Sequence, residues 1–176
     1  AEIVSYLLKN GADVNLVSGG WTALIEAADQ GSLESMKLLI DAGAEVNYYA
    51  GISSPTAISM AASEGKLESL KLLIDNGADI NGYGKSMAPL HIAAEENKTD
   101  VIDYLVSKNV KVNNRDASGR TALMYAAAEG NKQAVIKLIE AGADISMVDQ
   151  YGATAGVYAE KFVDLYLPKL EFQASP

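Results

Sequence analysis

The chain of 176 residues has no cysteine, a single histidine and only 7% aromatic residues. The lack of cysteine excludes disulfide bonds, thiolate zinc sites and thiol catalysis, and it fits a reducing and an oxidising compartment equally well. Because aromatic rings are scarce, leucine, isoleucine and alanine must fill the core. No apolar run approaches the ~18 residues of a membrane span, and the first residues lack a basic stretch followed by a signal core. We therefore expect no membrane insertion, leave the compartment open, and favour the cytoplasm.

Basic residues are also few. Lys and Arg number 14 against 23 Asp and Glu, which gives a formal net charge of −9. This charge repels a nucleic-acid backbone and disfavours anionic membrane surfaces, whereas it attracts a basic protein. The length and the 49% hydrophobic content are those of one compact unit.

A short turn motif occurs five times, at residues 10–15, 42–47, 76–81, 108–113 and 141–146. Its aligned central residues are Gly11, Gly43, Gly77, Asn109 and Gly142, which are spaced 32, 34, 32 and 33 residues apart. A second motif, led by Thr or Ala, begins at Thr22, Thr56, Ala88, Thr121 and Thr154 and has the same period. Self-similarity at about 33 residues is typical of a repeat architecture.

Each period predicts two helices. The Thr-led segment supplies an N-cap followed by small residues, which favours a short, closely packed inner helix. Apolar residues at helical spacing follow at residues 33–40, 67–74, 101–106 and 135–139 and predict an outer helix. The outer helix ends at Gly, or at Asn109 in one copy, and these residues tolerate the left-handed backbone that closes a helix. We expect all five central residues to have positive φ.

These motifs resemble the ankyrin repeat family. Residues 88–94 (Ala-Pro-Leu-His-Ile-Ala-Ala) are similar to its inner helix, and residues 113–123 to its finger. The resemblance covers essentially the whole chain and implies an all-α solenoid of helix–turn–helix units with β-hairpin-like fingers. It divides a single domain, 1–176, into a partial repeat (1–18), four repeats (about 19–51, 52–84, 85–117 and 118–150) and a C-terminal capping repeat (151–176).

Both ends depart from a regular array. Residues 1–8 already have the outer-helix pattern, so Ile3, Val4 and Leu7 would lack a covering neighbour, and we expect an excerpt of a longer protein. Beyond Thr154 charged residues interrupt the pattern, which suits a cap with a wetter outer face.

The candidate motifs for chemistry are weak. Gly84-Lys85-Ser86 precedes a helix, but a phosphate-binding loop needs a glycine where Asp79 stands. His91 occupies a place in the inner-helix motif where the imidazole usually bonds neighbouring backbone, so we expect a structural role. Asn97-Lys98-Thr99 matches a glycosylation sequon but is better interpreted as a turn between helices. No carboxylate spacing favours calcium or magnesium. We expect no catalytic residues, no cofactor, no metal and no enzyme activity.

The resemblance places the fifth, eighth and ninth residues of each Thr-led segment in a concave groove. The candidate partner-binding residues among them are Glu26, Asp29, Met60, Glu64, Ile92, Glu95, Glu96, Tyr125 and Glu129. Solvated helix positions would explain the carboxylates, but not Met60, Ile92 and Tyr125, which would form an apolar patch. Because most lysines fall on outer helices, we expect an acidic groove with an apolar centre.

The fingers add four further candidates. Three fingers differ in length from the family norm, and they carry Trp21, Tyr48, Tyr49 and Tyr83. Such rings anchor interfaces, although each could instead pack on a neighbouring finger.

We therefore expect a monomeric protein-interaction scaffold whose favoured partner is a basic protein. The alternatives are an immunity-type inhibitor of a basic effector or toxin, and the recognition or regulatory segment of a larger enzyme. Nucleic-acid binding would need an isolated basic patch at Lys111, Arg115 and Arg120.

Overall fold

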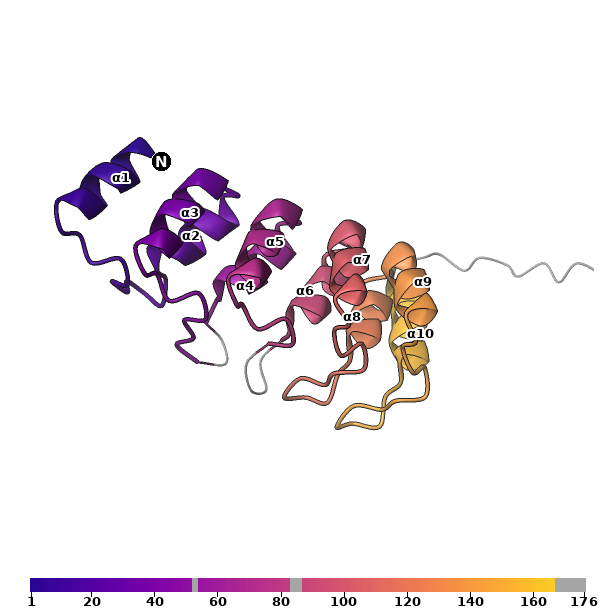
Figure 1. Ribbon diagram of the computed structural model, residues 1–176. Helices are drawn as coiled ribbons and strands as arrows, with labels where there is room; N and C mark the ends of the chain where they lie inside the picture. The colour runs from indigo at the N-terminus through magenta and orange to yellow at the C-terminus, as the bar shows by residue number, and fades with distance from the viewer. Residues whose placement is uncertain (52–53, 83–86, 167–176) are drawn as a thin grey trace, which may run out of the picture.

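The computed structural model describes residues 1–51, 54–82 and 87–166, with side chains up to residue 160. Helices of two kinds alternate along this part of the chain (Figure 1). The outer helices are α1 (Glu2–Lys9), α3 (Leu33–Asp41), α5 (Leu67–Asp75), α7 (Thr99–Ser107) and α9 (Lys132–Glu140). The inner helices are α2 (Ala23–Asp29), α4 (Ala57–Ser63), α6 (Pro89–Glu95), α8 (Ala122–Ala128) and α10 (Ala155–Tyr166). The predicted alternation is confirmed.

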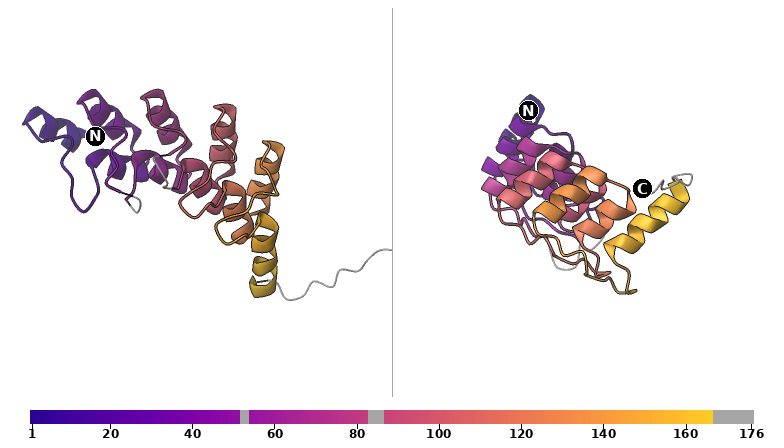
Figure 2. Two further views of the ribbon diagram at one scale, coloured as in Figure 1. Left: turned by 90° about the horizontal axis from the view of Figure 1, so that it is seen from below. Right: turned by 90° about the vertical axis from the view of Figure 1, so that its right-hand side faces the viewer.

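The helices stack as two rows in one curved solenoid (Figure 2). Inner helices pack on inner helices from α2 to α10, and outer helices pack on outer helices from α1 to α9. Alanines with no exposed surface lie where inner helices meet, among them Ala28, Ala61, Ala94 and Ala126. Their short side chains permit the close approach that the sequence predicted. The described residues contain no strand, and one isolated bridge joins Ser18 and Trp21, so the fingers have less β character than expected.

Hydroxyl side chains cap free backbone N–H groups at the start of α2 and α4. The Thr22 hydroxyl accepts from the Ile25 N–H at 3.3 Å, and Thr56 and Ser59 cap each other reciprocally. Ala88 has no hydroxyl, so α6 needs another device. His91 supplies it, because its Nδ1 accepts the Ala88 N–H at 3.0 Å.

Every outer helix of the described residues is followed by the predicted left-handed residue. The φ angles of Gly11, Gly43, Gly77, Asn109 and Gly142 are +83°, +90°, +85°, +58° and +89°. The turn also bonds the last carbonyls of the helix. In α3, the N–H groups of Gly43 and Ala44 donate to the carbonyls of Ile40 and Leu39, both at 2.9 Å. The prediction of five positive φ angles is confirmed.

Asparagines tie each turn to the next one along the solenoid. Asn47 donates through Nδ2 to the Gly77 carbonyl at 2.8 Å and accepts the Asp79 N–H at 3.0 Å. Asn15 and Asn113 make the same pair of bonds, and Asn81 accepts the Lys111 N–H. We call this series the asparagine ladder. It ends at Ser146, whose hydroxyl bonds Asp144 of its own turn.

The described part of the C-terminal end exposes apolar side chains, while the side chains from residue 161 onward in the predicted cap lie outside the description. Ile139 and Ile145 are 48% and 64% exposed, and Val157 of α10 is also exposed. The described part of this end is therefore apolar, because α10 covers α8 but leaves the flank of α9 open.

Gly77→Val tests the left-handed turn. A Cβ at Gly77 would meet nothing within 4 Å, so the substitution costs backbone strain alone, about 1–2 kcal/mol. Urea denaturation measures this loss. Gly156→Ala is the control: Gly156 lies in α10 without positive φ and should gain stability, by roughly 0.5–1 kcal/mol. An unchanged midpoint for Gly77→Val would contradict the assignment.

Asn47→Ala tests the ladder. It removes two hydrogen bonds between neighbouring turns and leaves their backbone partners to solvent, so we expect a loss of about 1–2 kcal/mol in the free energy of unfolding. Ser146→Ala is the matched control, because it removes only a bond within one turn and should cost less than about 0.5 kcal/mol. Equal losses in the two variants would show that the ladder adds nothing beyond local turn geometry.

Candidate functional site

The nine predicted groove residues lie on consecutive members of the inner row. Glu26 and Asp29 belong to α2, Met60 to α4, Ile92 and Glu95 to α6, and Tyr125 to α8, while Glu64, Glu96 and Glu129 are the C-cap residues of α4, α6 and α8. Because each inner helix packs on the next, these positions form one row along the solenoid. We call this row the groove surface.

Carboxylates supply most of the exposed part of the groove surface. Glu26, Glu64, Glu96 and Glu129 are exposed, and Asp29 and Glu95 are half-buried. Partial burial, followed by repulsion from Glu96 and Glu129, raises the pKa of Glu95 above its ordinary value. Arg120 offsets only part of this effect. Glu95, Glu96 and Glu129 therefore lie close enough to repel one another between α6 and α8.

The apolar residues of the groove surface are less exposed than predicted. Met60 and Ile92 are half-buried, and Met60 packs against the core. They lie on adjacent helices, so they can offer an apolar strip but no large anchor.

Tyr125 has a structural task that the sequence did not predict. Its hydroxyl donates to Asp116 Oδ2 at 2.7 Å, and its ring meets His91 edge-on with centroids 5.9 Å apart. Burial, followed by the bond to Asp116, raises the pKa of Tyr125 well above its ordinary value. Removing this ring should therefore cost stability, in addition to any effect on the expected apolar patch.

A cation near the groove was also missed. The guanidinium of Arg120 lies between two rings, 5.7 Å from the Tyr125 centroid and 4.9 Å from that of Tyr158. The Tyr158 hydroxyl donates to Asp149, and the Tyr125 hydroxyl donates to Asp116. In both pairs the aspartate lies nine residues before the tyrosine. The signal was present: an Asp and a Tyr nine residues apart occur twice, one period apart.

The finger aromatics separate into different cases. Trp21 and Tyr48 are half-buried and pack against the core, so part of each ring already serves the fold. Tyr49 is half-buried. Tyr83 lies outside the described residues.

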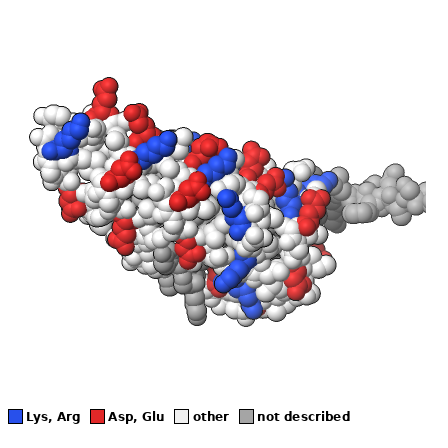
Figure 3. Space-filling model, in the orientation of Figure 1, with Lys and Arg blue, Asp and Glu red and all other residues white. Residues whose placement is uncertain are grey.

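The outer face carries charges of both signs. Lys37, Lys71 and Lys137 lie on outer helices, as predicted. Acidic residues alternate with the basic ones there (Figure 3), and ion pairs join Lys71 to Glu68 and Lys137 to Asp103. The outer face is therefore mixed in charge.

The candidate chemical groups have structural places. His91 is buried, its Nε2 donates to the Asn114 carbonyl at 3.1 Å, and burial lowers its pKa. Its predicted structural role is confirmed. Asn97 lies in the turn between α6 and α7 with φ of +52°, as expected. Gly84-Lys85-Ser86 lies outside the described residues. In the described part of the chain, no group of three or more His, Asp and Glu side chains converges as a metal site.

The family model for ankyrin repeats (three copies) matches residues 1–50 and 53–159. The chain belongs to the ankyrin repeat family. It is 34% identical over 163 residues to the probable 26S proteasome regulatory subunit p28 of Saccharomyces cerevisiae, covering 88% of the chain and 71% of the yeast protein. It is 36% identical over 94 residues to the putative ankyrin repeat protein L271 of Acanthamoeba polyphaga mimivirus, covering 51% of the chain and 13% of the viral protein.

A third match is to a protein named as an enzyme. The chain is 25% identical over 161 residues to the L-asparaginase of Dirofilaria immitis, which covers 91% of the chain and 27% of that protein. The chain thus spans only a small part of several of its relatives. The ankyrin repeat is typically a non-catalytic module that binds other proteins. None of the described helices is long and apolar enough to cross a membrane.

Glu95→Gln tests the electrostatics of this ankyrin groove. A carboxyl with a raised folded-state pKa opposes folding when ionised, so the penalty is full above that pKa and absent below the unfolded value. We expect the variant to melt higher than the parent at pH 7, by on the order of 1 °C, with the difference vanishing at pH 3. Glu26→Gln removes an exposed groove charge on α2 and serves as control. A difference that persists at pH 3 would exclude the electrostatic cause.

Proposed function

We propose that the chain is a non-catalytic scaffold whose groove surface binds a basic protein. The observation that carries this proposal is the row of carboxylates on the inner helices and their C-caps, next to the half-buried strip of Met60 and Ile92. The mutual repulsion around Glu95 supports it, because a cation from a partner would relieve that repulsion.

The contrast between the two faces favours the groove as the docking side. On the outer face, lysines stand beside acids and two of them form ion pairs, so the local field largely cancels. Beside the groove surface, Arg120 acts on Glu95, but its Nε also lies 3.9 Å from Asp149 Oδ2, so its charge is shared. An uncompensated negative field steers a basic partner and raises its association rate.

Nucleic-acid binding is disfavoured. The basic patch that it needs would combine Lys111 with two arginines that are already engaged. Arg115 donates to the carbonyls of Gly119 and Val148, and Arg120 lies between two tyrosine rings. With the net charge of −9, little basic surface is left for a phosphate backbone.

Two versions of this function remain open. The L-asparaginase and the tyrosine-protein kinase HTK16 of Hydra vulgaris are matched over 27% and 9% of their lengths, which supports a recognition or regulatory segment of a larger enzyme. An immunity-type inhibitor of a basic effector would use the same groove. In both versions the groove residues bind and do no chemistry.

Affinity capture with charge-matched baits tests the docking side. The groove bait carries Gln at Glu26, Glu64, Glu96 and Glu129. The control bait loses four exposed acids of the outer helices, through Glu34→Gln, Asp41→Asn, Asp75→Asn and Glu140→Gln. Because both baits change the net charge equally, we expect the partner on the parent and control baits but not on the groove bait. Loss on the control bait alone would place binding on the outer face.

Surface plasmon resonance with the captured partner separates steering from anchoring. The groove-charge variant should associate more slowly, by ~10-fold at low salt, and show a flatter salt dependence. Met60→Ala and Ile92→Ala should act mainly on dissociation, with up to ~2 kcal/mol lost. Melting temperatures provide the folding control, since Met60 also packs against the core. Wild-type kinetics in every variant would refute the groove assignment.

A further inference from the structure

Two kinds of side chain repeat along the groove surface between α4 and α8. The C-cap residues of α4, α6 and α8 are exposed glutamates, namely Glu64, Glu96 and Glu129. We call these three residues the acid row. The residues four positions before them are half-buried and largely apolar, namely Met60, Ile92 and Tyr125. We call these three residues the apolar row.

The acid row and the apolar row run side by side across the inner helices. Residues four positions apart lie on the same face of an α-helix, about 6 Å apart along its axis. Each of α4, α6 and α8 therefore offers one acidic and one apolar side chain to the groove. A ligand chain that lies along both rows meets such a pair once per inner helix.

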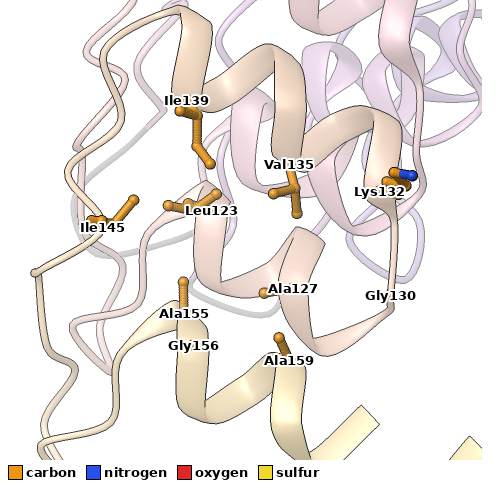
Figure 4. A pocket seen from close by; sticks show the side chains of 10 residues that line it. All are labelled: Leu123, Ala127, Gly130, Lys132, Val135, Ile139, Ile145, Ala155, Gly156 and Ala159. Carbon is orange, nitrogen blue, oxygen red and sulfur yellow. The ribbon is translucent and has the colours of Figure 1, made fainter. Parts of the chain in front are cut away.

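The spacing of these pairs is the spacing of the inner helices. Packed helices lie about 8–10 Å apart, depending on the side chains at the contact, and small side chains allow the closer distances. The contacts here are made by alanines without exposed surface, such as Ala61 and Ala94. Figure 4 shows the same kind of contact between α8 and α10, where Ala127 and Ala159 point toward one another. Inner helices also pack more closely on one another than outer helices do, so the rows repeat at about 9 Å.

The polyproline II helix is the regular backbone that matches this repeat. A β-strand returns a side chain to the same face every two residues, after about 6.6 Å, and again after about 13 Å. An α-helix returns to nearly the same face after seven residues, or about 10.5 Å, and so gains about 1.5 Å on the rows at each repeat. A polyproline II helix returns every three residues, after about 9.3 Å.

The three faces of a polyproline II helix also suit the two rows. Of every three residues, one can face the acid row, one the apolar row and one the solvent. Basic side chains limit the acid row on its other side, because Lys66 and Lys98 follow two of its members by two residues and lie against Gly31 and Gly65 of the preceding turns. The negative strip is thus about one side chain wide, and it favours a single base per turn of the ligand.

We infer that the groove surface takes a polyproline II segment of the partner with a lysine or arginine at every third residue. The bases pair with the acid row, and the apolar residues between them lie on the apolar row. Proline suits the apolar places, because it fixes the backbone before binding and so lowers the entropy lost on binding. The inference rests on the groove function proposed above, to which it adds the conformation and spacing of the bound segment.

The change of pattern at α2 sets the length of this segment. Helix α2 has the uncharged Gln30 at its C-cap and Glu26 four residues earlier, so both rows stop there. Three turns of the ligand, about nine residues, fill the rows from α4 to α8.

Two nine-residue peptides with blocked ends test the spacing. The first repeats Lys-Pro-Pro three times, and the second is Lys-Pro-Pro-Pro-Lys-Pro-Pro-Pro-Lys, which has the same composition and charge but lysines four residues apart. In NMR titrations of the 176-residue chain at low salt, we expect the first to bind about 10-fold more tightly. The second can align one lysine and loses two exposed ion pairs, at roughly 3-fold each. An alanine-rich helical peptide with three lysines seven residues apart should bind no better than the second.

A charge exchange locates the pairing. Glu96→Lys should weaken binding of the first peptide by about 10-fold, because it replaces an attraction in the middle of the acid row with a repulsion. Replacing the middle lysine of the peptide with glutamate should restore binding to this variant. Glu34→Lys makes the same change at an exposed position of α3 and should bind like the parent. Melting temperatures check that both variants are folded.

The outcomes separate this inference from the proposed function. Equal binding of the two proline peptides, lost on the groove bait and kept on the control bait, would overturn the spacing and leave the groove function in place. Tighter binding of the helical peptide, or no binding of the first peptide at ~1 mM, would overturn the polyproline II conformation. Peptide binding that persists on the groove bait would contradict both proposals.

Discussion

Successive turns are held in register by two hydrogen bonds from one asparagine side chain to the backbone of the next turn. The Asn47 side chain bonds the carbonyl of Gly77 and the N–H of Asp79, which lie 30 and 32 residues ahead. Water would otherwise have to solvate these two backbone groups. Because Asn15 and Asn113 repeat this geometry, the spacing between turns is fixed by one residue type at one period. These bonds tie together the turns beneath the stacked helices.

Much of the fold could be predicted from the sequence. Helix order, caps and left-handed turns follow from local chemistry repeated every 33 residues or so, and repetition turns weak local signals into a strong one. Even the irregular copies obeyed the rule, since Asn109 adopts the backbone angle of the glycines. The exposure of Ile3 and Leu7 on α1 also agrees with the sequence-based expectation.

The groove was predictable in position but not in chemistry. The place of a residue in the repeat determines which helix face it occupies, so the carboxylates fell on the inner row as expected. Tyr125 shows the limit: its partners Asp116, His91 and Arg120 come from other segments and meet only through the fold. Periodicity indicates where a side chain points, whereas its hydrogen bonds depend on residues that the period does not specify.

The helix pairs in substantial contact all join neighbours along the stack, and no contact of this size links distant ones in the described chain. A tensile load applied at the two ends therefore passes through every junction in series, as through the links of a chain. Such a structure resists extension only as well as its weakest junction, however many junctions it has. Its compliance, in contrast, grows with each one added, so a longer stack of the same junctions is a softer spring.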